Sequence, residues 1–112
     1  MTVNDATRGT ADDRRPGGTG ARLARERLEQ ERHARTAELA VLESRGDLRS
    51  DEAALTRFDT LRKTLEEVEA ALARLDAGTY GICEGCNEPI PEGRLEILPY
   101  ARFCVRCQQR RR

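Results

Sequence analysis

The chain has 112 residues, of which 38% are apolar and 4% aromatic, so it can build one small domain with a thin core but not two independent globular units. Its twenty basic and twenty acidic residues cancel, which disfavours a general nucleic-acid binder because such proteins need a net positive face. No apolar run approaches the roughly 20 residues of a membrane span, and the first residues lack the apolar core of a secretion signal, so we expect a cytoplasmic protein without membrane contact.

The first 20 residues are predicted to form a disordered tail. They contain Pro16, Gly17, Gly18 and Gly20 with balanced charges and no hydrophobic periodicity. Such a segment buries too little apolar surface to offset the entropy of ordering it. We therefore expect the folded part of the chain to begin at residue 21.

Residues 21–44 are predicted to form a first helix, because they lack Gly and Pro and are rich in Glu, Arg, Leu and Ala. Gly46 suits the left-handed residue that follows a helix. Ser50 can cap a second helix, with Asp51 and Glu52 favourably placed near its positive end. A turn of about four residues is expected between the two helices.

The second helix carries the clearest periodic signal in the sequence. Its apolar residues alternate in steps of four and three, as in a heptad seam: Ala54, Phe58, Leu61, Leu65, Val68, Leu72 and Leu75. Gly78 ends the helix, which is therefore about 25 residues or roughly 38 Å long. A seam of that length needs a partner helix.

The first helix offers a weaker seam. Leu28, Leu39 and Leu42 have compatible spacing, but Arg32 and Arg35 interrupt the row. The short connection favours an antiparallel hairpin within one chain, and we expect a monomer. Pairing of the seams between two chains is the alternative. The predicted fold is thus mainly all-α, with a two-helix coiled-coil hairpin over residues 21–77 whose tip lies at about residues 45–52.

Four cysteines follow the hairpin in a pattern typical of zinc sites. Cys83 and Cys86 are separated by two residues, seventeen residues follow, and Cys104 and Cys107 repeat the two-residue gap. Each short gap lets one tight knuckle supply two thiolates, and two knuckles complete a tetrahedral site. The sequence therefore predicts a four-cysteine zinc finger over residues 78–112, with one structural ion and a basic C-terminal tail.

Other uses of the cysteines are less favoured. Two disulfides would suit a secreted protein, a redox pair would need a β-α-β setting that is absent here, and iron is the other metal such a set accepts. A full set of thiolates leaves no open position for water, and the chain shows no nucleophile and base pair and no phosphate loop. We therefore expect no enzyme activity and no cofactor other than the metal.

The finger resembles the DksA/TraR family of bacterial transcription factors. The matching residues are Tyr80-Gly81-Ile82-Cys83-Glu84-Gly85-Cys86, Ile90, Arg94-Leu95-Glu96, Pro99 and Cys104-Val105-Arg106-Cys107-Gln108. Together with the hairpin, the resemblance covers about residues 21–110. Asn87 stands where the family usually has Gly, and both residues tolerate the left-handed conformation that a knuckle needs.

The resemblance implies a protein that binds RNA polymerase rather than DNA, with its hairpin in the secondary channel and an acidic tip near the active centre. The family tip typically reads Asp-x-x-Asp-x-Ala. Asp51, Glu52 and Ala53 supply its second half, whereas Leu48 stands in place of the first Asp and Asp47 is displaced by one residue. Helix-end electrostatics is the alternative role for Asp51.

Many family members also respond to guanosine tetraphosphate, held between the factor and polymerase by basic residues around the finger. Arg94 matches a position of the family motif, but Gln108 follows the last Cys where responsive members tend to carry Lys. Two other functions stay open. One is a zinc-ribbon nucleic-acid binder that uses Arg102, Arg106 and the terminal Arg triplet of residues 110–112; the other is a dimeric coiled-coil adaptor.

Overall fold

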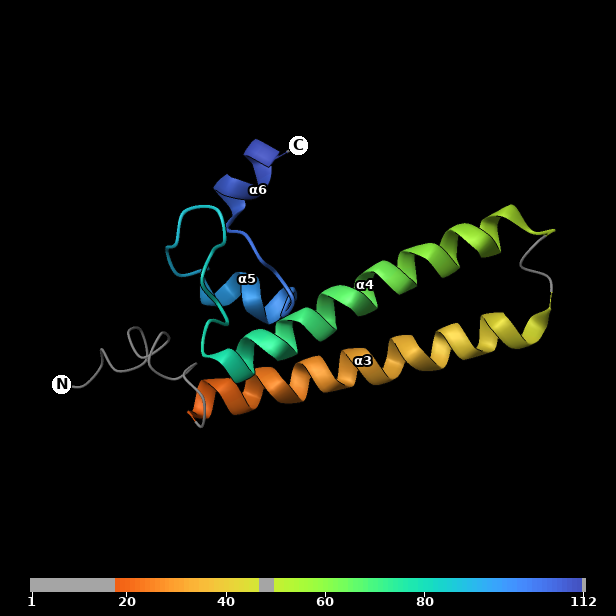
Figure 1. Cartoon of the computed structure of the whole chain (residues 1–112), viewed down its shortest axis with the longest axis horizontal. Coiled ribbons are helices and arrows are strands. Elements are labelled where there is room, and N and C mark those ends of the chain that lie inside the picture. Colours follow the sequence, from red (N-terminus) through yellow and green to blue (C-terminus); the bar gives the residue numbers. More distant parts are fainter. Residues whose placement is uncertain (1–17, 47–49, 112) are drawn as a thin grey trace.

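The computed structural model describes residues 18–46 and 50–111. Two long helices, α3 (Thr19–Arg45) and α4 (Glu52–Ala77), lie side by side as an antiparallel hairpin, and two short helices, α5 (Glu92–Ile97) and α6 (Val105–Arg111), belong to the finger that follows (Figure 1). The described residues contain no strand, only an isolated antiparallel bridge between Ile82 and Pro89. The mainly all-α hairpin-plus-finger fold is confirmed. No helix in the described ranges is long and apolar enough to cross a membrane.

α3 begins earlier than the sequence predicts. Thr19 and Gly20 are helical, and Gly18 caps the helix with its carbonyl accepting the amide of Arg22 at 3.0 Å. Ala21, only 7% exposed, packs in the core at the base of the hairpin within this first turn. Residues 18–20 therefore belong to the fold, while the predicted disorder of residues 1–17 lies outside the described residues.

The two helix ends at the turn are capped in different ways. Gly46 has φ 75°, the left-handed conformation expected of it. The cap of α4 is Asp51 and not Ser50: Asp51 has extended backbone (φ −116°, ψ 103°), and its carboxylate accepts the amide of Ala54 at 3.1 Å. The prediction of Ser50 as the cap was therefore wrong by one residue, because that carboxylate satisfies one of the free amides of the first turn.

The hairpin seam is packed, but not evenly. Of the apolar residues predicted for α4, five are buried, whereas Phe58 and Leu65 are only half-buried. On α3, Arg35 occupies the seam position seven residues from both Leu28 and Leu42, and it pairs with Glu31 at 2.9 Å. This polar interruption separates the core into two clusters. The distal one contains Leu42, Ala54 and Leu61, with Leu39 and Phe58 packed against it.

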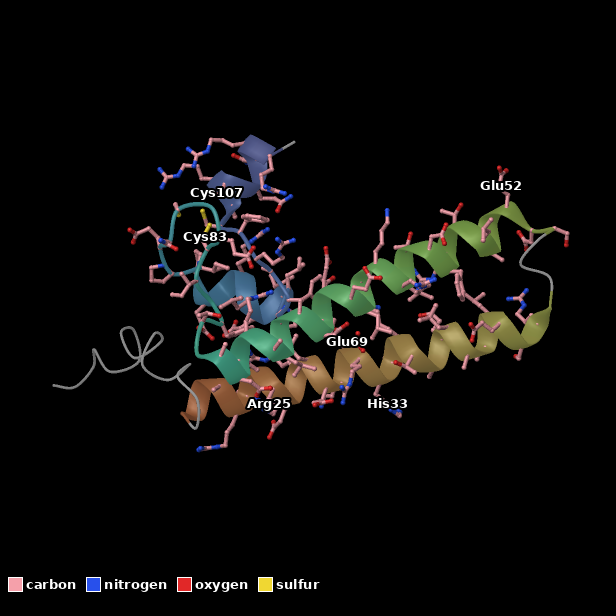
Figure 2. All side chains as sticks on the ribbon, in the orientation of Figure 1. Arg25, His33, Glu52, Glu69, Cys83 and Cys107 are labelled. Carbon is pink, nitrogen blue, oxygen red and sulfur yellow. The ribbon has the colours of Figure 1, made fainter. Side chains whose placement is uncertain are left out.

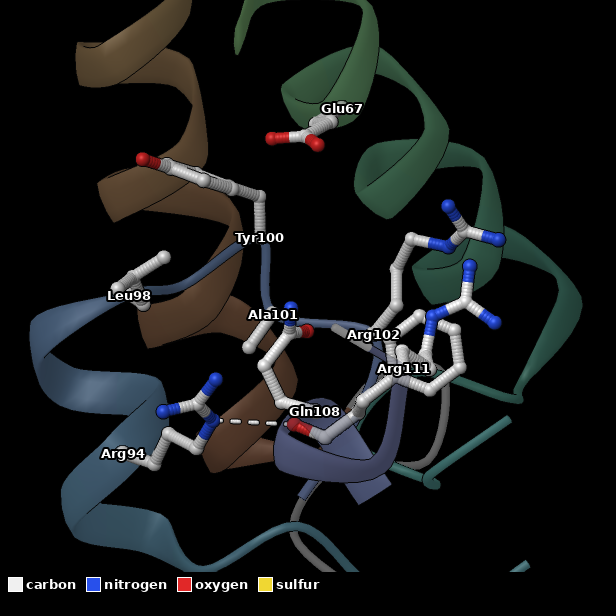
Figure 3. A pocket seen from close by; sticks show the side chains of 9 residues that line it. Glu67, Arg94, Leu98, Tyr100, Ala101, Arg102, Gln108 and Arg111 are labelled. Carbon is white, nitrogen blue, oxygen red and sulfur yellow. Dashed lines mark hydrogen bonds between the residues drawn. The ribbon is translucent and has the colours of Figure 1, made fainter. Parts of the chain in front are cut away.

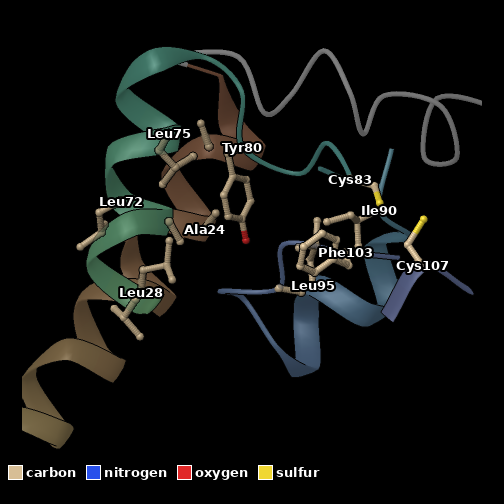
Figure 4. Packing of buried hydrophobic residues seen from close by; sticks show 14 residues of the cluster. Ala24, Leu28, Leu72, Leu75, Tyr80, Cys83, Ile90, Leu95, Phe103 and Cys107 are labelled. Carbon is tan, nitrogen blue, oxygen red and sulfur yellow. The ribbon is translucent and has the colours of Figure 1, made fainter. Parts of the chain in front are cut away.

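The basal cluster joins the hairpin to the finger. Leu28 and Leu75 share one continuous core with Tyr80, Leu95 and Phe103 (Figure 4). The buried hydroxyl of Tyr80 donates a hydrogen bond of 2.7 Å to the carbonyl of Pro99. The finger therefore packs on the base of the hairpin, while the tip lies at the other end of α3 and α4 (Figure 1).

Candidate metal centre

Two knuckles supply the four cysteines. In the first, the amide of Cys83 donates to the carbonyl of Glu88 at 2.8 Å, and the amide of Asn87 donates back to the carbonyl of Cys83 at 2.8 Å. Asn87 has φ 63°, the left-handed conformation expected at this position. In the second, Cys104 immediately precedes α6 and Cys107 lies within it, held by the amide of Gln108 donating to the carbonyl of Cys104 at 2.9 Å.

The knuckles bring all four sulfur atoms together. The Sγ atoms of Cys83, Cys86, Cys104 and Cys107 lie within 4.8 Å of one another, and those of Cys86 and Cys104 are 3.9 Å apart. A tetrahedral site with bonds of about 2.3 Å has sulfur atoms roughly 3.8 Å apart, whereas a disulfide needs about 2.05 Å. The arrangement fits one tetrahedral metal ion better than two disulfides.

Hydrogen bonds donated to the sulfur atoms favour the negatively charged thiolate form of the cysteines. Sγ of Cys83 accepts the amides of Gly85 and Cys104, both at 3.3 Å. Sγ of Cys104 accepts the amide of Cys107 at 3.4 Å, and Sγ of Cys107 accepts Nη2 of Arg110 at 3.3 Å. Such donors orient metal ligands and stabilise their charged form.

The thiols of the cluster differ in acidity: the pKa values of Cys83 and Cys104 are lowered, whereas that of Cys107 is raised. Burial raises the pKa of Cys83, but the amides of Cys104, Cys86 and Gly85 outweigh it and lower that pKa to about 6. Burial and the neighbouring thiols of Cys104 and Cys83 raise the pKa of Cys107 to about 11. Because four thiolates this close repel one another, the set becomes fully charged only beside a cation.

The backbone of Gly85 passes directly against the sulfur cluster. A methyl group at its Cα would lie 2.9 Å from Sγ and 3.1 Å from Cβ of Cys107, and 3.6 Å from Sγ of Cys83. Only glycine leaves enough room for the knuckle to close at this distance. Gly85 therefore belongs to the site through its lack of a side chain, a requirement that the cysteine spacing alone does not reveal.

An ion-pair network beside the site connects the finger to α4. The carboxylate of Glu84 accepts Nη2 and Nε of Arg102 at 2.9 and 3.1 Å, and Nη1 of Arg74 lies 3.8 Å away. The hydrogen bond from Arg102 is the main cause of a lowered pKa at Glu84, while burial lowers the pKa of Arg74. Sequence reasoning missed Arg74, which looks like any surface arginine until the finger packs over it.

The arginines of the finger are largely committed to contacts within it. Arg102 and Arg111 lie over the ring of Phe103, at 5.2 and 4.2 Å from its centroid. Nη2 of Arg110 reaches Sγ of Cys107. Arg102, Arg106, Arg110 and Arg111 are all exposed, but three of them make these contacts within the finger. Arg112 lies outside the described residues.

A cleft of about 420 Å³ lies between α4 and the finger (Figure 3). Arg94, Arg102, Arg111 and Gln108 line it together with the carboxylate of Glu67. The structure therefore brings together the two positions singled out for a nucleotide, but Nε of Arg94 already donates to the carbonyl of Phe103 at 3.0 Å. Part of the Arg94 guanidinium is therefore used for a hydrogen bond within the finger.

The predicted tip residues lie far from the metal site. Glu52, labelled in Figure 2, and Ala53 are exposed at the start of α4, and Asp51 is half-buried because it caps the helix. The cysteines lie at the opposite end of the hairpin (Figure 2). Asp47 lies outside the described residues, so its place beside Asp51 stays a prediction.

Comparison with known proteins identifies the finger and its relatives. Residues 78–112 match the family described as the prokaryotic dksA/traR C4-type zinc finger. The chain is 38% identical over 82 residues to the RNA polymerase-binding transcription factor DksA of Caulobacter vibrioides, covering 73% of this chain and 54% of that protein. It is 51% identical over 47 residues to general stress protein 16O of Bacillus subtilis, covering 42% and 29%.

A solved structure shares the fold. The transcription factor DksA2 from Pseudomonas aeruginosa superimposes with a TM-score of 0.72 at 22% identity, covering 99% of this chain and 89% of that one. This likeness concerns the arrangement of hairpin and finger. The matches to the curated relatives span about half of their length or less.

Proposed function

Because the chain belongs to the DksA/TraR family of C4-type zinc-finger proteins, we propose that it regulates transcription by binding RNA polymerase in the cytoplasm. The observation that carries the proposal is a hairpin that projects from the finger and presents Asp51, Glu52 and Ala53 at its far end. With 26 residues, α4 is about 39 Å long at 1.5 Å per residue. A rod of this length suits the polymerase secondary channel.

We propose that Cys83, Cys86, Cys104 and Cys107 bind a single zinc ion. The separations of the sulfur atoms, the amide donors around them and the family of the finger support this assignment. Since four thiolates fill a tetrahedral site, the ion would stabilise the finger and leave no position for a reacting water. We expect no enzyme activity, and the relatives named as transcription factors agree with that role.

We propose further that the charge of Asp51 acts on polymerase. Asp51→Asn tests this, because Asn caps helices as well as Asp and can still accept the amide of Ala54. The variant should keep its thermal stability and its polymerase affinity while its control of promoter complexes weakens in run-off transcription. Asp47→Asn should have a smaller effect, and Asp59→Asn on the exposed surface of α4 is the control for loss of one charge.

The outcomes of this experiment separate two roles of Asp51. If Asp51→Asn regulates like the wild-type protein at saturating concentration, the acidic-tip mechanism is wrong and Asp51 serves only as a helix cap. If Asp51→Ala loses stability, by about 1 kcal/mol as for other cap removals, while Asp51→Asn loses regulation alone, both roles are present. A pull-down of core polymerase with wild-type protein comes first, because failure to bind would refute the proposed function.

A response to guanosine tetraphosphate at the polymerase interface is a second proposal. The cleft beside the finger supplies three guanidinium groups, from Arg94, Arg102 and Arg111, which suit a polyphosphate. Glu67, the neutral Gln108 and the contacts that these three arginines already make within the finger work against it, so we expect a weak response. Run-off reactions with and without the nucleotide, in the presence and absence of this protein, test it, and equal regulation in both would remove the proposal.

A nucleic-acid binder is less favoured, because Arg102, Arg110 and Arg111 make contacts inside the finger. Salt-titrated binding to duplex DNA tests it, and we expect no sequence-specific affinity. The coiled-coil adaptor predicts a dimer, whereas the hairpin pairs its two seams within one chain. Sedimentation is expected to show a monomer.

A further inference from the structure

A groove of about 450 Å³ runs between α3 and α4 in the middle part of the hairpin. Its apolar residues are Leu39, Phe58 and Leu65, which are all half-buried although they occupy seam positions. On α3, the groove is also lined by Thr36 and Ala40, whose small side chains leave Phe58 and Leu65 of α4 partly uncovered. The groove therefore follows from a mismatch in side-chain size across the seam.

The rim of this groove carries an excess of negative charge. Glu43, Glu66 and Glu69 line it, against Arg62 alone on the positive side. Glu69 lies about midway along the hairpin (Figure 2). Within residues 18–46 and 50–111, none of the three carboxylates forms an ion pair.

Two carboxylates elsewhere on the hairpin form ion pairs between α3 and α4. Nη2 of Arg57 lies 2.7 Å from Glu38, and Nη2 of Arg25 lies 2.6 Å from Asp76. Among the described residues, the groove thus carries three unpaired carboxylates against one guanidinium, although the composition of the whole chain is neutral. We call this feature the acidic groove, defined by Leu39, Glu43, Phe58, Leu65, Glu66 and Glu69.

We infer that the acidic groove binds a basic amphipathic helix of the protein partner, and this inference rests on the proposed function, in which that partner is RNA polymerase. Phe58 and Leu65 are seven residues apart on α4, about 10 Å along the axis, which matches two turns of a helix lying in the groove. Apolar residues at positions i and i+3 or i+4 of that helix would contact Leu39, Phe58 and Leu65. Its Lys and Arg side chains would pair with the three carboxylates.

The charge of the groove selects against the other classes of occupant. Phosphate groups would be repelled by Glu43, Glu66 and Glu69, so a nucleic acid does not fit. Two copies of this chain packed groove to groove would place like charges opposite each other. A basic helix is the occupant that satisfies both the apolar floor and the acidic rim.

Neutralising the rim without altering the floor provides the test. The triple substitution Glu43→Gln, Glu66→Gln and Glu69→Gln changes only exposed side chains, so thermal unfolding should stay as in the wild-type protein. We expect the affinity for core RNA polymerase, measured by biolayer interferometry, to fall about tenfold at low salt, and its salt dependence to become shallower, because exposed charge pairs are lost. The matched control is Glu26→Gln, Glu88→Gln and Glu96→Gln, which removes the same charge from exposed positions outside the groove and should leave affinity within about twofold.

The possible outcomes distinguish failure of the inference about the groove from failure of the proposed function. Equal polymerase affinity of the wild-type protein and the groove variant would overturn the inference while leaving the proposed function intact. Failure of the wild-type protein to bind polymerase would overturn the proposed function and the inference with it. A photo-crosslinking residue at exposed Thr36 should capture a polymerase segment with alternating basic and apolar faces. Capture of a second copy of this chain, or of a polymerase segment without Lys or Arg, would also overturn the inference.

Discussion

Gly85→Ala is expected to weaken metal binding without touching any ligand. The added methyl would lie 2.9 Å from Sγ and 3.1 Å from Cβ of Cys107, where ordinary contacts begin at 3.4 Å. The backbone of Gly85 does not have positive φ, so alanine there avoids the strain of a left-handed conformation. Its amide still donates to Sγ of Cys83. The whole effect is therefore steric.

The magnitude follows from the rigidity of what the methyl meets. A sulfur atom bound to a metal cannot rotate away, so the knuckle must open by several tenths of an ångström, and such overpacking costs about 1 to 3 kcal/mol. This corresponds to a loss of zinc affinity between about fivefold and 150-fold. Gly93→Ala is the control on the same finger, because nothing lies within 4 Å of its added methyl. As an alanine in helix α5, it should leave the finger unchanged or stabilise it by up to about 1 kcal/mol.

Competition with a chromophoric chelator at neutral pH measures the zinc affinities of the wild-type protein and both variants. We expect Gly85→Ala to release zinc at a lower chelator concentration than the other two and to unfold at a lower temperature. If Gly85→Ala and Gly93→Ala had the same zinc affinity, Cys107 would not be held against position 85 as in the structure, and the steric requirement for glycine there would be refuted.

Three further changes test the packing around the site. Removal of the metal by a chelator should reduce hydrogen-exchange protection at the base of α3 and α4 as well as in the finger, because one core joins the hairpin to the finger. Loss of protection in the finger alone would contradict this prediction. Leu61→Ala should lower the free energy of unfolding by about 2 to 5 kcal/mol, since Leu61 is 1% exposed. Leu65→Ala should lower it by clearly less, because Leu65 is half-buried in the groove. Equal losses of the two variants in chemical denaturation would refute the uneven packing of the seam. Tyr80→Phe removes the buried hydrogen bond to Pro99 and should cost about 1 to 2 kcal/mol, while unchanged thermal stability would show that this bond does not hold the finger.

The helices and their ends could be predicted from the sequence where they depend on residues that are close together in the chain. A heptad seam and a glycine after the last helical residue act within a few residues, so the two helices and the left-handed Gly46 and Gly78 followed from the pattern. The cap at Asp51 was missed because Ser50 and Asp51 are both good cap residues. Only the observed backbone shows which of them lies at the boundary of α4.

The candidate metal site was likewise predictable from the sequence only where it depends on residues close together in the chain. The spacing of Cys83, Cys86, Cys104 and Cys107 predicts a four-thiolate site because two-residue knuckles are local structures, and the structure brings all four sulfur atoms together. The contact of Gly85 with Cys107 joins two knuckles separated by the whole finger, so only the folded chain reveals it.

The sequence by itself thus determined a helical hairpin, a four-cysteine finger and the family resemblance, because helix periodicity and knuckle spacing depend on short-range geometry. Tertiary structure decided the rest. It placed Glu84 between Arg74 and Arg102, and it merged the finger with the base of the hairpin into one core. It also left Phe58 and Leu65 partly uncovered, because Thr36 and Ala40 of α3, which line the same groove, have small side chains. These features depend on which residues distant in sequence meet in space, and on whether their sizes and charges match.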